Sequence, residues 1–140
     1  MCGRYNVTDS PKIQGLMGEL GMAGFAPKPQ VNVPPGGTGE FVMEAADGRH
    51  LLSGIWSLLI EPRPVGDGYR PNPKFHTFNA RSDRLTSSPL WKKVYPSKRC
   101  IIPVSASTNG RANRSTTSTL KTRQRLWPVY GNPGISATSR

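Results

Sequence analysis

The sequence predicts a single α+β domain in which short helices accompany strands. Its 140 residues leave room for one domain with a normal core. One early segment has apolar residues at helical spacing, whereas several later segments are short, apolar and bounded by turn residues, as strands are. The 15 glycines and 14 prolines mark many turns between these segments.

The first predicted element is a short amphipathic helix. Asp9 or Ser10 can cap it, Pro11 suits its first turn, and Gly21 is a stop signal. Four apolar residues fall on one helical face, as expected for a helix that packs on a core: Ile13, Leu16, Met17 and Leu20.

The middle of the chain predicts a hairpin flanked by two loops. Residues 23–40 are rich in proline and glycine and read as a loop. Residues 41–46 and 51–60 have the composition of strands, and Asp47-Gly48 between them is a strong hairpin turn. Residues 61–74 contain four prolines and predict a second loop, whose basic and aromatic side chains also suit single-stranded nucleic acid.

Two features of this region have both a structural and a functional interpretation. Trp56 belongs either to the core or to the edge of a cleft where a base could stack. The run Asn32-Val33-Pro34-Pro35-Gly36 is either a proline turn or part of a site. Composition alone favours the structural interpretation in both cases.

Residues 75–83 predict an extended segment with functional side chains. Asn79 and Arg81 alternate along it, so both point to one face. An amide and a guanidinium on one face can orient a sugar hydroxyl and a phosphate. The structural alternative is a capped turn in which Asp83 pairs with Arg84.

The last predicted elements are a helix and a buried strand. Ser88 with Pro89 opens the helix, and Pro96 ends it. Residues 99–104 are mostly apolar and predict a buried strand. Cys100 within this strand is expected to be a core residue.

The charge of the chain is basic and unevenly distributed. The net charge is +11, but residues 1–105 hold 13 Lys and Arg against 8 Asp and Glu, and residues 106–140 hold six and none. A basic balance favours nucleic acid as the partner. The sequence shows neither a long apolar run nor a secretory signal, so we expect a location in the cytoplasm or nucleus, at the nucleoid if bacterial.

The N-terminus carries a distinctive chemical group. If Met1 is removed, Cys2 bears a free amine and a free thiol on adjacent carbons, with reference pKa values of about 8 and about 8.5. An aldehyde can form a Schiff base with the amine, and the thiolate can then close a five-membered thiazolidine. The alternative is an ordinary cysteine in a frayed terminus.

Five motifs in order resemble one protein family, the SOS-response-associated peptidases, which are abasic-site processing proteins of DNA repair. The resemblance covers roughly residues 2–105 and rests on Met1-Cys2-Gly3-Arg4-Tyr5, Asn32-Val33-Pro34-Pro35-Gly36, Phe78-Asn79-Ala80-Arg81-Ser82-Asp83, Trp91 and Arg99-Cys100-Ile101-Ile102-Pro103. Each motif is modest by itself, but five in the right order are specific.

The resemblance implies a fold and a chemistry. The fold is a domain of antiparallel strands in an open barrel with short helices. Cys2, exposed by removal of Met1, captures the aldehyde of an abasic site in single-stranded DNA as a thiazolidine crosslink, and Asn79 helps to hold the sugar. The candidate DNA-binding residues are Arg4, Asn32, Trp56 and Arg81. No cofactor, metal or membrane partner is expected, and the protein is expected to be a monomer.

The chain departs from the family pattern after Ser105. The family has Gly-Phe-Tyr-Glu-Trp there, with a glutamate of the site, and a histidine further on, whereas this chain has Ala106-Ser107-Thr108-Asn109-Gly110. One back-translation of these five residues, shifted by a base, reads Gly-Phe-Tyr-Glu-Trp. The same shift at 126–132 gives a plausible apolar strand, so our leading hypothesis is a frameshift. We therefore divide the chain into a family domain, 1–105, and a basic Ser/Thr-rich tail, 106–140, expected to be irregular.

This departure leaves three functional hypotheses. The first is a DNA-repair protein that acts through Cys2, with little activity in this form because the glutamate and histidine are missing. The second is a non-enzymatic fragment that binds single-stranded nucleic acid through its basic charge. The third is a thiol peptidase, which would need a histidine to activate the thiol.

Overall fold

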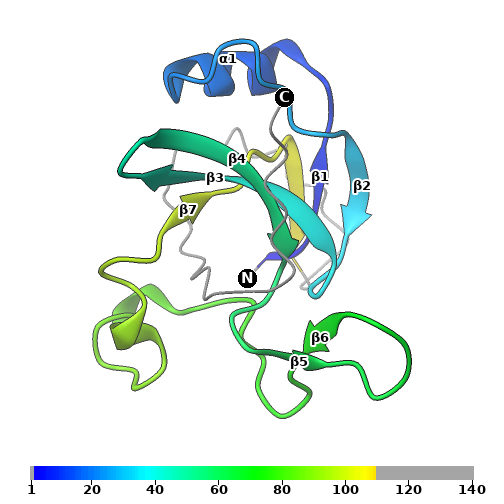
Figure 1. The fold of residues 1–140 in the computed structure, drawn as a ribbon, viewed down its shortest axis with the longest axis vertical. Coiled ribbons are helices and arrows are strands. Elements are labelled where there is room, and N and C mark those ends of the chain that lie inside the picture. Colours follow the sequence, from blue (N-terminus) through cyan, green and yellow to red (C-terminus); the bar gives the residue numbers. More distant parts are fainter. Residues whose placement is uncertain (1, 110–140) are drawn as a thin grey trace.

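Within residues 2–109, which the computed structural model describes, the chain folds mainly into antiparallel strands with one α-helix (Figure 1). The elements in chain order are β1 (Cys2–Val7), α1 (Pro11–Glu19), β2 (Gln30–Val33), β3 (Thr38–Ala45), β4 (Gly48–Ile55), β5 (Ile60–Pro62), β6 (Tyr69–Pro71), the 3₁₀ turns η1 (Ser82–Arg84) and η2 (Trp91–Lys93), β7 (Cys100–Ile101) and β8 (Ala106–Asn109). The predicted α+β class is confirmed, and an open barrel remains a prediction.

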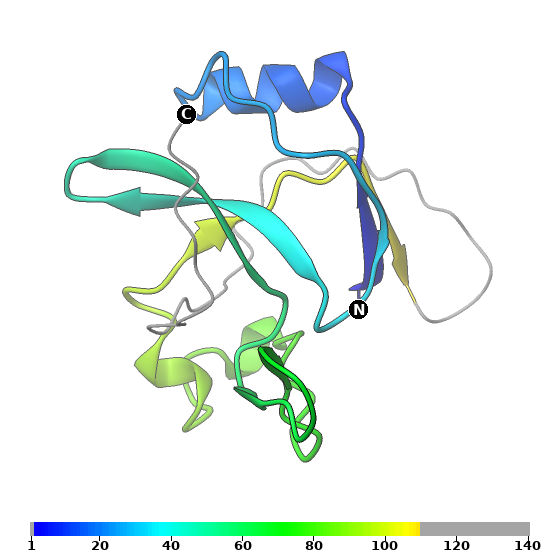
Figure 2. The same ribbon diagram turned by 45° about the vertical axis from the view of Figure 1, so that its right-hand side comes forward.

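Helix α1 forms where the apolar spacing predicts it. It ends at Glu19, and Gly21 just beyond it has a left-handed backbone (φ 67°). The N–H of Met22 donates to the carbonyl of Met17 at 2.8 Å. The buried residues of its cluster are Ile13, Met17, Leu20, Met22 and Val42, with Leu16, Leu51 and Ile101 packed against them. The helix therefore covers the sheet of strands β4, β3 and β7, as both ribbon views show (Figure 2).

The predicted hairpin is confirmed, with different limits. Strands β3 and β4 pair from Thr38 opposite Ile55 to Ala45 opposite Gly48. Strand β3 thus begins inside the segment predicted as a loop, and β4 ends five residues before the predicted end of its strand. Cross-strand pairing determines where these strands begin and end. Proline and glycine content does not indicate which residues pair.

Strand β1 is the centre of a second sheet, in which β2 and β8 flank it. Its inward side chains are Tyr5 (4% exposed) and Val7 (2%). A Cβ atom on Gly39 would collide with the Tyr5 hydroxyl, so glycine is needed there to admit the ring. These contacts bury β1 on one face and place its alternate residues on the other.

Strand β8 corrects one prediction about the tail. Residues 106–140 were expected to be irregular, but Ala106–Asn109 pairs with β1, with Ser107 opposite Tyr5. Backbone groups form such a ladder without an apolar side-chain pattern, so composition missed it. The remainder of the predicted tail, 110–140, lies outside the described residues.

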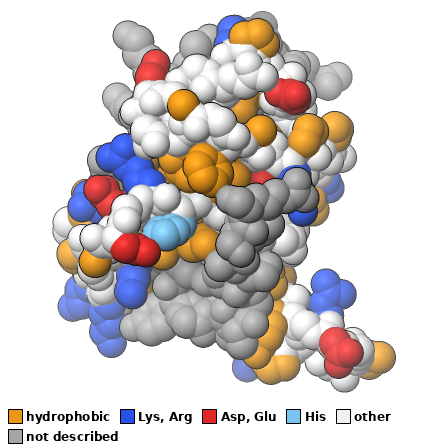
Figure 3. All heavy atoms as spheres, turned by 45° about the horizontal axis from the view of Figure 1, so that its top comes forward, with side chains coloured by type: hydrophobic (Ala, Val, Ile, Leu, Met, Phe, Trp, Pro, Cys, Tyr) orange, Lys and Arg blue, Asp and Glu red, His pale blue; other side chains and the backbone are white. Residues whose placement is uncertain are grey.

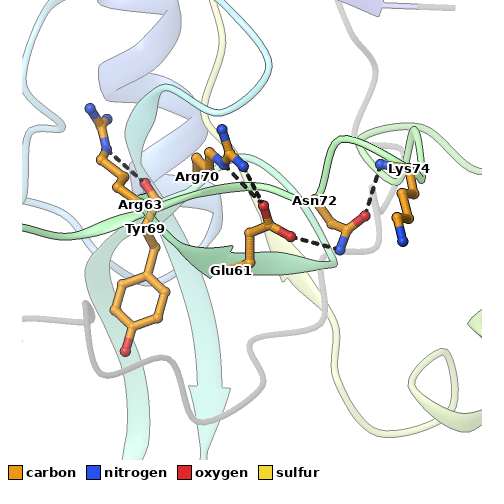
Figure 4. Close-up of polar contacts among 6 residues, drawn as sticks. All are labelled: Glu61, Arg63, Tyr69, Arg70, Asn72 and Lys74. Carbon is orange, nitrogen blue, oxygen red and sulfur yellow. Dashed lines mark hydrogen bonds and ion pairs between the residues drawn. The ribbon is translucent and has the colours of Figure 1, made fainter. Parts of the chain in front are cut away.

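A second hairpin replaces the loop predicted at 61–74. Strands β5 and β6 pair with Glu61 opposite Arg70. The Glu61 carboxylate accepts hydrogen bonds from the Arg70 guanidinium (2.7 and 3.0 Å) and from the Asn72 amide (3.0 Å), as Figure 4 shows. The ion pair between Glu61 and Arg70 joins the two strands directly and helps to stabilise the hairpin. The proline content of the segment had predicted a loop instead.

The second half has less regular structure than predicted. Residues 75–81 form no strand, and the helix predicted from Ser88 to Pro96 is reduced to turns around η2. The strand predicted at 99–104 shrinks to β7, because pairing with β3 extends only over Val42 and Met43. Cys100 is buried (4% exposed), which confirms its expected place in the core.

Candidate functional site

Strand β1 places Cys2 at the beginning of the central strand of its sheet. The Cα register sets Cys2 opposite Asn109 of β8, and an irregularity in the pairing follows between Cys2 and Arg4. The structure therefore places the backbone of Cys2 in a paired strand. Such an irregularity re-aims the residues beside it, because it breaks the strict alternation of the strand.

Arg4 and Asn32 lie together on the exposed side of this sheet. The Arg4 guanidinium donates to the carbonyl of Asn32 at 3.2 Å. Asn32 has a left-handed backbone (φ 59°), which is uncommon outside glycine, and its N–H donates to the Asn6 side-chain oxygen at 2.6 Å. Asn6 thus holds β2 in the conformation that presents the Asn32 carbonyl to Arg4. Backbone strain of this kind often accompanies functional sites.

Trp56 belongs to the core. Its side chain is 4% exposed and packs on Tyr5 of β1, with ring centroids 5.1 Å apart. The indole N–H donates to the carbonyl of Phe78 at 3.1 Å, and the Phe78 ring meets the indole edge-on at 6.2 Å. The structure thus supports the core interpretation, and stacking of a base on Trp56 would require this packing to open.

Thr77 anchors the segment that carries Asn79. Thr77 is 4% exposed, and its hydroxyl oxygen accepts the N–H of Leu59 at 2.9 Å and lies 3.2 Å from the Ser57 hydroxyl. Its carbonyl accepts the N–H of Leu58 at 3.1 Å. Asn79, two residues on, is half-buried. The segment that leads to Asn79 is therefore anchored by a buried polar cluster rather than by a strand.

Arg81 does not share a strand face with Asn79. It is exposed, and its guanidinium donates two hydrogen bonds to the Asp83 carboxylate, at 2.9 and 3.0 Å. The hydrogen bonds from Arg81 lower the pKa of Asp83, and the Asp83 carboxylate raises the pKa of Arg81. Asp83 thus pairs with Arg81, whereas the alternative interpretation of the sequence paired it with Arg84.

The core connects the two halves of the candidate site. Tyr5 lies on the strand that Cys2 begins, Trp56 bridges Tyr5 to Phe78, and Asn79 follows Phe78 directly. The sequence interpretation missed the two residues that hold the ends of this arrangement, Asn6 and Thr77. Their only signal was a polar side chain in an otherwise apolar or extended context.

Two other kinds of site are absent from the described part of the chain. Over residues 2–109, the structure contains no group of three His, Cys, Asp or Glu side chains able to hold a metal ion. Nor does any helix among those residues have the length and apolar character needed to cross a membrane.

Comparison with protein-family models identifies the family. The model of the SOS response associated peptidase (SRAP) family matches residues 1–107. The chain belongs to this family. The resemblance inferred from five short motifs is thereby confirmed, and the match includes the first two residues of β8. Comparisons with curated proteins and with solved structures gave no significant match.

Membership of the SRAP family gives the chain a coarse functional assignment. It associates the protein with the DNA-damage response and DNA repair, with DNA as an interaction partner. The family name relates it to peptidase-like enzymes. The reaction and the roles of individual residues need a further argument.

Proposed function

We propose that this SRAP protein captures abasic sites in single-stranded DNA through Cys2, after removal of Met1. The α-amine of Cys2 attacks the aldehyde of the opened sugar, and loss of one water gives a Schiff base. The thiolate then adds to the imine carbon, the nitrogen takes up a proton, and a thiazolidine links the protein to the DNA. This sequence of bonds consumes no oxidant and needs no cofactor.

One structural observation supports this proposal most strongly. The aromatic chain from Tyr5 through Trp56 to Phe78 ties the strand of Cys2 to the segment of Asn79. A nucleophile gains reactivity when the groups that orient its substrate are held in place beforehand. We assign Asn79 to the sugar and the linkage.

The DNA backbone would be held by polar groups around this centre. We assign Arg4 and Arg81 to phosphates, because a guanidinium forms paired hydrogen bonds with phosphate oxygens. Asn32, whose main-chain carbonyl accepts a hydrogen bond from Arg4, carries a side-chain amide that we assign to the same DNA strand. Trp56 acts indirectly, because its core packing holds Tyr5 and Phe78 in place. A direct contact between Trp56 and a base would require this packing to open.

The chain is expected to react slowly. The family pattern supplies a glutamate and a histidine for proton transfer, and in this chain the only histidines are His50 and His76. His50 is engaged with the Asp47 carboxylate at 2.9 Å, and His76 lies on an exposed segment with its ring edge-on to Phe78. General acid–base assistance typically raises a reaction rate by about 10²–10⁴-fold. We therefore expect crosslinking by this chain to be slower by about that factor than with both groups present.

A crosslinking assay tests this proposal. The protein is incubated with a single-stranded oligonucleotide that contains one abasic site, and products are separated on a denaturing gel. We expect a slow covalent band that persists without borohydride, because a thiazolidine survives where a Schiff base reverses. Cys2→Ala should abolish the band, and an oligonucleotide with a reduced, aldehyde-free sugar should give none.

The same assay separates the alternatives. A band that Cys2→Ala leaves unchanged would contradict the proposal. Salt-sensitive binding without any covalent product would favour a binding fragment. Cleavage of unrelated peptides that depends on Cys2 would favour a thiol peptidase.

A further inference from the structure

The net charge of the described domain is concentrated in one short segment. Residues 1–83 hold eight Lys and Arg and also eight Asp and Glu, so they are balanced. Residues 84–99, here called the basic lobe, hold five basic residues and no acidic one: Arg84, Lys92, Lys93, Lys98 and Arg99. All five are exposed. The basic character of the domain is thus a local property of this lobe.

The basic lobe is a compact series of turns rather than an open loop. Backbone N–H groups of Ser88, Lys92, Tyr95 and Lys98 each donate to the carbonyl four residues earlier, at 2.8–2.9 Å. Val94 anchors the lobe with a side chain that is 3% exposed. These bonds present the basic side chains from an ordered surface, which reduces the entropy lost when they bind a partner.

The basic side chains of the lobe are available for a partner. Among the residues that the structure describes, the ion pairs involve Arg49, His50, Arg70 and Arg81, all of which lie outside the lobe. Figure 3 shows Lys and Arg side chains gathered at the lower left of the drawn face, the side on which Figure 1 places the lobe. Unneutralised cations on one surface favour a polyanion.

We propose that the basic lobe binds the backbone of the single-stranded DNA that flanks the reacting sugar, without regard to base sequence. This inference rests on the proposed function. The lobe follows Asn79 and Arg81 directly in the chain, so a strand held there can continue onto it. Trp91 and Tyr95 stand among the basic residues and are half-buried, which leaves part of each ring accessible. Aromatic rings between cations suit unpaired bases, because paired bases expose no face for stacking.

The salt dependence of binding tests the lobe separately from the chemistry. Affinity for a lesion-free single-stranded oligonucleotide is measured over a range of salt concentrations with the full chain. Each phosphate contact contributes about −0.7 to the slope of log K against log salt concentration. The triple variant Lys92→Gln, Lys93→Gln, Lys98→Gln should therefore reduce the slope by about 2.

A matched control distinguishes location from total charge. The variant Lys12→Gln, Lys28→Gln neutralises two exposed lysines outside every segment assigned to nucleic acid, and both variants retain the six basic residues of 106–140. The control should keep nearly the wild-type slope. Equal slopes in the two variants, or an unchanged slope in the lobe variant, would overturn the inference. Tighter binding of a duplex of the same sequence would also contradict the assignment to single strands.

The outcome remains interpretable if the proposed chemistry fails. A wild-type protein that gives no crosslink but shows the lobe-dependent slope would refute the capture of abasic sites and support the lobe. If the wild-type protein crosslinks but the lobe variant keeps the wild-type slope, the capture of abasic sites is supported and the role of the lobe is refuted. Thermal unfolding of each variant checks that both retain the wild-type fold, as exposed substitutions should.

Discussion

Replacing Thr77 by valine tests whether the segment of Asn79 depends on a buried hydroxyl. Valine keeps the branched shape of threonine but cannot accept a hydrogen bond. The Leu59 N–H, which donates to the Thr77 hydroxyl oxygen at 2.9 Å, would lose its partner. The Ser57 hydroxyl would lose a neighbour at 3.2 Å but would keep its bond to the Leu59 carbonyl at 3.0 Å.

The structure sets the size of the effect. An orphaned buried donor costs about 1–3 kcal/mol, and loss of the weaker contact adds about 0.5 kcal/mol. The extra buried methyl group offsets a part of this loss, at about 0.8 kcal/mol for a CH₂-sized group. We therefore expect Thr77→Val to lower the free energy of unfolding by about 2 kcal/mol. For a domain of about 100 residues this corresponds to a fall in Tm of about 10 °C.

Urea unfolding followed by tryptophan fluorescence measures this change, because Trp56 is buried next to the affected segment. With an m value of about 2 kcal/mol/M, the midpoint should fall by about 1 M. Thr77→Ser retains the hydroxyl, and Thr86→Val makes the same change at an exposed position, so both should lie closer to wild type. A Thr77→Val protein within about 0.5 kcal/mol of wild type would refute the anchoring role.

Two further predictions concern single residues of the candidate site. Asn32→Ala should destabilise the protein by about 1 kcal/mol, because alanine resists the left-handed backbone that asparagine tolerates; Asn32→Gly is the control, and an equal loss in both, by urea unfolding, would point to the side chain instead. Asp83→Asn should reduce stability only above the lowered pKa of Asp83. Arg81 depresses that pKa, so the pair stabilises the fold above about pH 4, and its contribution disappears as pH falls through the lowered value. Unfolding midpoints of wild type and variant should converge at low pH, and a constant difference from pH 7 to pH 2 would contradict this account.

Local signals in the sequence predicted the elements that form mainly from their own residues. Helix α1 needed only its apolar spacing and the stop at Gly21, because its hydrogen bonds are internal. The hairpin of β3 and β4 needed only strand-like composition and the turn at Asp47-Gly48. Motifs read in order were also sufficient to predict the family.

The missed and shortened strands share one physical cause. Strands β5, β6, β7 and β8 have two to four residues each, so they exist only through partners elsewhere in the chain. The helix expected between Ser88 and Pro96 has the local signals of a helix but forms only separate turns. The hydrogen bonds of these turns do not continue into a regular helical series. A pattern confined to one segment contains no information about either outcome.

The sequence by itself determined the chemical groups of the site: the aminothiol that Cys2 can carry, the amide of Asn79, and the excess of positive charge after Asp83. Only the tertiary structure decided how these groups are held. It buried Trp56 as the bridge between Tyr5 and Phe78, and it anchored the Asn79 segment through Thr77. Side-chain chemistry is a property of each residue, whereas burial and pairing depend on residues that are distant in the chain and become neighbours only on folding.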